Sequence, residues 1–186
     1  MSFVEFLAAQ LRLAHIPPAP PPDLSFLDAP IEKFNLPENY VVLVPGCSPT
    51  ALHKRWPHYG ELAALLQKHG LRCILVGTKD DAEAIDSIRA TAPDSINLCN
   101  QTSLQELTGI FRRAVGVIGN DTGPVHLAAA IGTPILALFS DTSSPAWSKP
   151  PGTKSTVLQR PILADLDAKE VETAFHALLQ HTKNKG

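Results

Sequence analysis

The sequence lacks several features that would assign it to a membrane or nucleic-acid class. No apolar run reaches the length of about 18 residues that a transmembrane helix needs. Residues 1–13 are apolar but have no basic start and no small-residue cleavage site, which argues against a secretion signal. The 16 basic and 18 acidic residues give a net charge of −2 without a block of like charge. We therefore expect neither a nucleic-acid surface nor a polybasic membrane patch.

Cysteine is scarce. Cys47, Cys73 and Cys99 lie far apart and have no ligand-like spacing with histidine. Cys73 and Cys99 stand in or beside apolar runs typical of strands, so buried free thiols are favoured over a disulfide or a metal site. Free thiols fit a reducing compartment, and we expect a cytoplasmic protein.

The 186 residues are enough for one well-buried domain and few for two. Residues 3–14 predict a short helix with Phe3, Leu7 and Leu11 on one stripe, and the proline run at 16–23 predicts a stiff, extended connector. We therefore expect a helix and linker over residues 1–35 and a domain over residues 36–186. The apolar stripe then needs a covering surface, either another domain or a second copy of the chain.

From Tyr40 onward, short apolar runs alternate with helical patterns. Runs without polar alternation predict strands covered on both faces, at 40–44, 71–76, 114–118 and 134–139, with weaker candidates at 96–98 and 156–158. The helical patterns lie at 59–66 before Gly70, at 82–88, at 107–111 behind the capping-box pair Ser103 and Glu106, and at 171–179 behind Asp167 and Glu170. This order predicts an α/β fold with a doubly wound, mostly parallel sheet.

Ligands of such sheets bind beyond the carboxyl ends of the strands, which directs attention to residues 119–126. Pro124 suits the first position of a helix, and Gly123 lets a ligand approach the backbone. The first amides of that helix and its dipole can bind a phosphate. The alternative is a capped helix and no more, with Asp121 or Thr122 as the cap and His126 as a satisfied, partly buried histidine.

Two further loops, at 45–57 and 77–83, leave the same predicted edge. The first carries the hydroxyls of Ser48 and Thr50 and the cations of Lys54 and Arg55, and a cation beside a diphosphate stabilises the charge of a leaving group. The alternative is that Lys54 and Arg55 are solvated and that Trp56 is a core residue. We adopt the core role for Trp56 and favour solvation for Arg55. Both interpretations stay open for Lys54.

In the second loop, Asp80 or Asp81 either caps the next helix or accepts hydrogen bonds from ribose hydroxyls. No G-x-G-x-x-G follows a predicted strand, so an oxidoreductase with a dinucleotide fingerprint is not expected.

Together the three loops resemble glycosyltransferase family 9, the heptosyltransferase family, over roughly residues 36–180. The resemblance is carried by Pro45-Gly46 with Lys54-Arg55-Trp56-Pro57, by Val76-Gly77 with a carboxylate soon after, by Gly119-Asn120-Asp121-Thr122-Gly123-Pro124 followed by His126 and Gly132-Thr133-Pro134, and by Leu138-Phe139 with Trp147.

The resemblance implies the Rossmann-like half of a two-domain GT-B glycosyltransferase that inverts the sugar and needs no metal or other cofactor. This half is expected to bind a nucleotide-sugar, typically ADP-heptose, for lipopolysaccharide or other cell-envelope glycan synthesis. The resemblance implies that Lys54 contacts the phosphates and the leaving group, with Ser48 and Thr50 nearby. It implies that Thr122 and Gly123 hold the diphosphate where the helix starts at Pro124, and that Asp121 and His126 face the donor sugar or phosphate. Asp81 is expected at the ribose, where the family usually has glutamate.

Two parts of the family pattern have no counterpart in this sequence. One is the cysteine-containing tail, since residues 152–162 read GTKSTVLQRPI. The other is the amino-terminal acceptor domain with its proposed general base, which inverting transfer needs. We therefore expect weak binding of ADP or an ADP-sugar and no transfer without an acceptor domain. A nucleotide-binding module without catalysis is the alternative, and peripheral association with the inner membrane is compatible with either.

Overall fold

A computed structural model describes residues 3–17, 23–142, 144–150, 152 and 154–183. Its centre is a six-stranded sheet in the order β3-β2-β1-β4-β5-β6, and all five neighbouring pairs run parallel. The strands are Tyr40–Val44 (β1), Arg72–Leu75 (β2), Ile96–Asn97 (β3), Gly116–Asn120 (β4), Ile135–Phe139 (β5) and Ser155–Gln159 (β6). The predicted α/β class with a doubly wound parallel sheet is confirmed.

The helices follow the strands in alternation. They are Phe3–Leu13 (α1), Tyr59–Lys68 (α2), Ala82–Thr91 (α3), Leu104–Arg113 (α4), Gly123–Ala130 (α5), Pro145–Ser148 (α6) and Ala168–Lys183 (α7). Short 3-10 turns lie at Ser25–Leu27 (η1), Glu32–Phe34 (η2), Pro49–Lys54 (η3), Lys79–Asp81 (η4) and Leu163–Asp165 (η5).

The predicted helix ends are also found. Ser103 and Glu106 exchange the two hydrogen bonds of a capping box at the start of α4, at 2.8 and 3.2 Å. The carboxylate of Asp167 accepts from the amides of Lys169 and Glu170 in the first turn of α7. Gly70, with a φ of 78°, follows α2 in the left-handed conformation that ends many helices.

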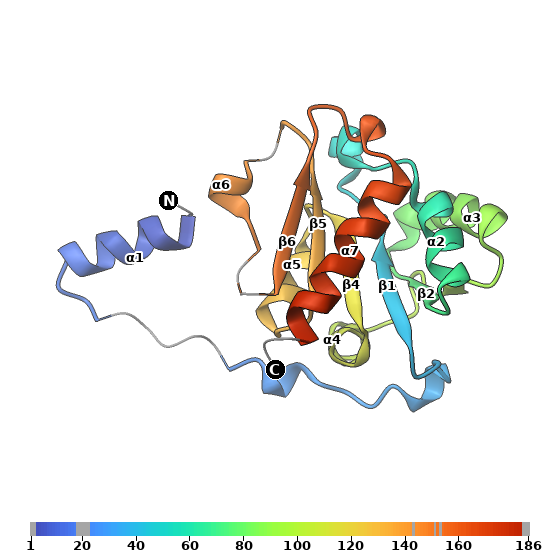
Figure 1. Cartoon of the computed structure of the whole chain (residues 1–186). Helices are drawn as coiled ribbons and strands as arrows, with labels where there is room; N and C mark the ends of the chain where they lie inside the picture. Colours follow the sequence, from blue (N-terminus) through green and yellow to red (C-terminus); the bar gives the residue numbers. More distant parts are fainter. Residues whose placement is uncertain (1–2, 18–22, 143, 151, 153, 184–186) are drawn as a thin grey trace.

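The sheet is covered on both faces, as Figure 1 shows. Side chains of α2, α3 and α7 pack on one face, and those of α4 and α5 pack on the other. Every residue of β1, β4 and β5 is therefore buried, which explains why these runs show no polar alternation in the sequence.

The segment before the sheet divides into two parts. Residues 24–34 pack on α4: Ile31 is buried, Arg112 donates to the carbonyl of Leu24 at 2.8 Å, and Arg113 pairs with Asp28 at 3.0 Å. Helix α1 lies beside α6 (Figure 1), and the ring centroids of Phe6 and Trp147 are 5.7 Å apart. The proline residues of 18–22 and the Phe3 side chain of the predicted stripe lie outside the described part of the chain. The other stripe residues, Leu7 and Leu11, are 43% and 38% exposed.

All three cysteines are free, but only Cys73 is buried, and this burial raises the pKa of its thiol to about 12. The expected burial of Cys99 is wrong, because β3 ends at Asn97 and Cys99 lies in the partly exposed loop that follows. Among the described helices, none combines the length and the apolar character that crossing a membrane requires.

Gly116 at the start of β4 is a point of close packing against α7. A Cβ atom there would lie 2.7 Å from Cε2 of Phe175, which is fully buried. We predict that Gly116→Ala lowers the free energy of unfolding by about 1–3 kcal/mol, the usual cost of overpacking, measured by urea denaturation. In a Phe175→Leu background the same change should cost clearly less. An equal loss in both backgrounds would contradict this packing explanation.

Candidate functional site

The strand order fixes where the site lies. Strand β1 has β2 on one side and β4 on the other, so the connections that leave β1 and β4 run in opposite directions. Open parallel sheets bind ligands at such a switch point, outside the carboxyl ends of the strands. Here the loops after β1 and β4 contain the residues that the sequence singled out.

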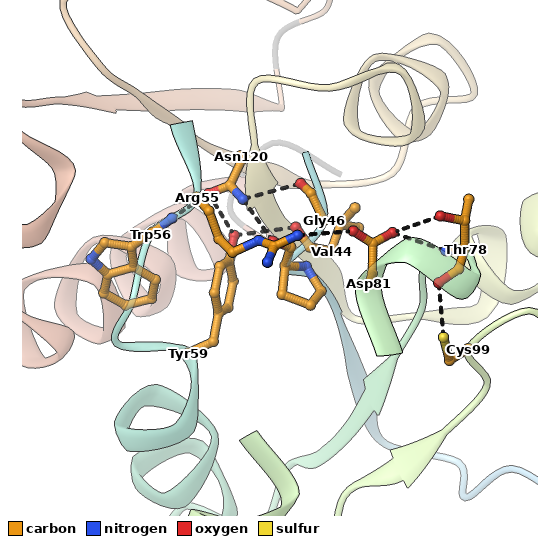
Figure 2. Close-up of polar contacts among 10 residues, drawn as sticks. Val44, Gly46, Arg55, Trp56, Tyr59, Thr78, Asp81, Cys99 and Asn120 are labelled. Carbon is orange, nitrogen blue, oxygen red and sulfur yellow. Dashed lines mark hydrogen bonds and ion pairs between the residues drawn. The ribbon is translucent and has the colours of Figure 1, made fainter. Parts of the chain in front are cut away.

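The side chain of Asn120, the last residue of β4, ties the loop after β1 to the sheet. Its Nδ2 donates to the carbonyls of Pro45 and Gly46 at 3.0 and 3.1 Å. Its Oδ1 accepts from the amide of Trp56 at 3.2 Å and lies 3.1 Å from the hydroxyl of Tyr59. Figure 2 shows Asn120 between these groups. Asn120 is fully buried, so its carboxamide sets the course of the whole loop.

A second polar chain joins the loops after β1, β2 and β3 (Figure 2). Arg55 lies 3.4 Å from Oδ1 of Asp81, whose Oδ2 accepts from the amide and hydroxyl of Thr78 at 2.9 and 3.1 Å. The thiol of Cys99 donates to the carbonyl of Thr78 at 3.0 Å. The solvated interpretation of Arg55 is therefore wrong, because its side chain turns inward to the buried carboxylate. Gly46 permits this, since a Cβ there would lie 2.7 Å from the Asp81 carboxylate.

Trp56 is the core residue that the sequence predicts. It is 1% exposed, and its Nε1 donates to the carbonyl of Leu166 at 2.8 Å. Burial raises the pKa of the neighbouring Tyr59 well above its ordinary value, so that the hydroxyl remains a donor beside Asn120.

A cavity of about 510 Å³ opens beside these loops. Its walls are apolar at the strand ends and along α4, and hydroxyls and carboxylates line its rim. The lining residues are Val44, Gly46, Cys47, Ser48, Val76, Gly77, Thr78, Asp80, Asp81, Thr102, Ser103, Leu104, Leu107, Thr122 and Pro124.

Three of the predicted residues form a charged group at the end of β4. The ammonium of Lys54 lies 3.7 Å from Oδ2 of Asp121, and Nε2 of His126 lies 3.0 Å from Oδ1 of the same carboxylate. The side chains of Lys54 and His126 are 26% and 35% exposed, so both can reach a ligand. Asp121 is held between two groups that can carry positive charge.

Gly123, the first residue of α5, borders open space. The hydroxyl of Thr122 donates to the carbonyl of Asn120 at 3.2 Å, and its side chain makes no capping hydrogen bond. Gly123 is exposed, and a Cβ atom added there would meet nothing within 4 Å. The part of the alternative in which the Thr122 side chain caps this helix is therefore wrong, because its hydroxyl donates to the carbonyl at the end of β4. The other part is confirmed, since His126 is partly buried and paired with Asp121.

The predicted site residues thus fall into adjoining groups. Ser48, Asp81, Thr122 and Pro124 line the cavity, and Thr50 joins it through a 3.0 Å contact between its hydroxyl and that of Ser48. Lys54, Asp121 and His126 lie together at the same edge, next to the exposed Gly123.

One wall of the cavity does not follow from the sequence. Thr102, Ser103, Leu104 and Leu107 line it from the start of α4, and Leu104 is 56% exposed. The capping box marks the start of this helix in the sequence, but only an exposed leucine directly behind the cap hints at a binding surface.

The family model for glycosyltransferase family 9 (heptosyltransferase) matches residues 7–176. The chain belongs to this family. Lipooligosaccharide heptosyltransferase 2 of Haemophilus influenzae is 34% identical over 113 residues, which are 57% of this chain and 32% of that protein.

Solved heptosyltransferases share the fold. The ADP-heptose lipopolysaccharide heptosyltransferase II of E. coli superposes with a TM-score of 0.74 and 28% identity over 86% of this chain and 51% of that structure. The E. coli heptosyltransferase WaaC, solved with ADP, superposes with a TM-score of 0.68 and 25% identity over 75% of this chain and 44% of that structure. This family 9 chain therefore spans about a third of the first curated relative and about half of the solved ones.

Asn120 should be the most sensitive residue of the family 9 site for folding. We predict that Asn120→Ala lowers the free energy of unfolding by about 3 kcal/mol, the upper end of the cost of leaving a buried polar group without a partner. Urea denaturation measures the loss. Asn39→Ala is the control, because Asn39 is exposed just before β1. Losses of equal size in the two variants would show that Asn120 does not organise the loop.

Proposed function

We propose that this chain is the donor-binding domain of an inverting glycosyltransferase of lipopolysaccharide or other cell-envelope glycan synthesis. Its donor is an ADP-activated heptose or a similar sugar, and it acts in the cytoplasm, where free thiols persist. One observation carries the proposal. An apolar-walled cavity at the switch point of the sheet adjoins a helix start that Thr122 leaves uncapped, next to the ammonium of Lys54.

The nucleoside fits the cavity. Its volume lies within the range of about 300–1,000 Å³ that small-molecule sites have. Val44, Val76, Leu104 and Leu107 offer apolar contacts to a base. The ribose then meets the rim at Asp81, whose Oδ2 already accepts two hydrogen bonds from Thr78, while Oδ1 keeps one acceptor position besides its contact with Arg55.

The diphosphate fits the start of α5. Amides of a first helical turn and the helix dipole attract an anion without any net positive charge of the protein. Gly123 leaves room for a phosphate oxygen at the backbone, and Lys54 adds a full positive charge. The solved E. coli heptosyltransferase with ADP supports this ligand class.

Transfer of the sugar leaves a nucleoside diphosphate whose charge grows as the glycosidic bond to phosphate breaks. Lys54 and the amides of α5 stabilise that charge, so we propose that the transfer step needs no metal ion. Asp121 positions Lys54 and His126 by its contacts with both. The base that removes the acceptor proton is expected from outside the residues assigned here.

The apolar wall at Leu104 and Leu107 predicts a preference for adenine. Guanine and uracil carry carbonyl oxygens, which would lose water against these two leucine side chains. We expect isothermal titration to show ADP binding about ten-fold or more tightly than UDP or GDP, a difference of about 1.4 kcal/mol. Tighter binding of UDP or GDP would overturn the donor assignment.

Lys54 should act on the phosphates alone. We predict that Lys54→Ala weakens ADP binding by about 1–3 kcal/mol, the range for hydrogen bonds with charged groups, and leaves adenosine binding unchanged. Titration of both ligands measures the difference. Lys68→Ala, at the exposed end of α2, is the matched control. An unchanged affinity for ADP, or an equal loss for adenosine, would remove Lys54 from the diphosphate site.

A further inference from the structure

A second group of ligand-type side chains lies away from the nucleotide site, where α2 packs on α7. His69 follows the last residue of α2, and Glu172 and His176 stand one turn apart on α7. Residues four apart on a helix share a face, so both side chains of α7 point toward the end of α2. One ligand atom of each residue lies within 4.8 Å of the other two.

The geometry of the group is close to that of a metal site. Nε2 of His69 lies 3.2 Å and Nε2 of His176 lies 4.0 Å from Oε1 of Glu172. Ligand atoms around a tetrahedral zinc ion with bonds of about 2.0–2.2 Å are about 3.3–3.6 Å apart. Small rotations of the two rings therefore bring all three atoms to bonding distance of one ion.

The group also contains polar atoms that the protein does not satisfy. Oε1 of Glu172 and Nε2 of His176 are both buried, and neither makes a hydrogen bond of acceptable geometry among the described residues, although Nε2 of His69 lies 3.2 Å from Oε1 of Glu172. The Glu172 side chain is 13% exposed. Buried polar atoms without a partner are costly, and a bound ion is one of the arrangements that satisfy them.

We propose that His69, Glu172 and His176 bind one divalent transition-metal ion of the zinc type. Two imidazoles and one carboxylate suit zinc and its neighbours in the first transition row, whereas magnesium and calcium prefer oxygen ligands alone. The side chain of His69 is 59% exposed, so the ion can enter from solvent. Three protein ligands leave a further coordination position for water.

The ion is a structural clip between α2 and α7. His69 stands just before β2 begins, at the amino ends of the strands, whereas the nucleotide cavity lies at their carboxyl ends. The ion therefore takes no part in sugar transfer, and this site does not depend on the proposed donor. Its effect is on stability, because a ligand that binds only the folded chain stabilises it.

The test is a titration of the full chain, after treatment with a chelator, with Zn²⁺ and separately with Mg²⁺. Calorimetry should show one Zn²⁺ ion per chain and no comparable binding of Mg²⁺. At about 100 times the dissociation constant, Zn²⁺ should raise the unfolding midpoint by about 5–10 °C. Co²⁺ in place of Zn²⁺ should give the visible absorption bands of imidazole coordination.

Each of His69→Ala, Glu172→Gln and His176→Ala should weaken Zn²⁺ binding more than about ten-fold, because even an outer-shell change costs metal sites that much. His181→Ala, on the exposed last turn of α7, should leave Zn²⁺ binding unchanged. Circular dichroism without metal shows whether each variant is folded. Zn²⁺ binding that survives in folded Glu172→Gln and His176→Ala, or that is absent in the unaltered chain, overturns the proposal.

Discussion

The carboxamide of Asn120 is the interaction on which the site depends. It satisfies two carbonyls and an amide of the loop after β1 from inside the fold, where water cannot replace it. Asn120 is also the last residue of β4. Its side chain therefore holds the loop after β1 against the end of β4, and the switch point lies between these two strands. The position of Lys54 relative to α5 follows from this contact, whereas Asp81 is held by Thr78 and Arg55.

The proposed site attracts a diphosphate through local groups and not through the net charge of the chain. A chain with a net charge of −2 has no overall field to attract a diphosphate, and two carboxylates stand at the proposed binding edge. Arg55 neutralises Asp81 from within, and Lys54 with His126 surrounds Asp121. The remaining attraction comes from backbone amides at the start of α5, which need no net charge.

Much of the fold could be predicted because burial leaves a direct pattern. The strands β1 and β5 read as unbroken apolar runs since both faces of the sheet are covered, and Ser103 with Glu106 marks the start of α4. Within the site, the polar turn after β4 was informative because its residues are adjacent in the chain. The sequence misleads at Arg55 because its partner, Asp81, follows a different strand and only the sheet brings the two together.

The sequence by itself determined the α/β class, the succession of strands and helices along the chain, and the loops that could carry chemistry, because these depend on local propensity and periodicity. Tertiary structure alone decided which groups meet. The wall formed by Leu104 and Leu107, the inward turn of Arg55, and the approach of His69 to Glu172 and His176 all join residues from separate elements. No spacing along the chain encodes such contacts, since they arise from how helices pack on a shared sheet.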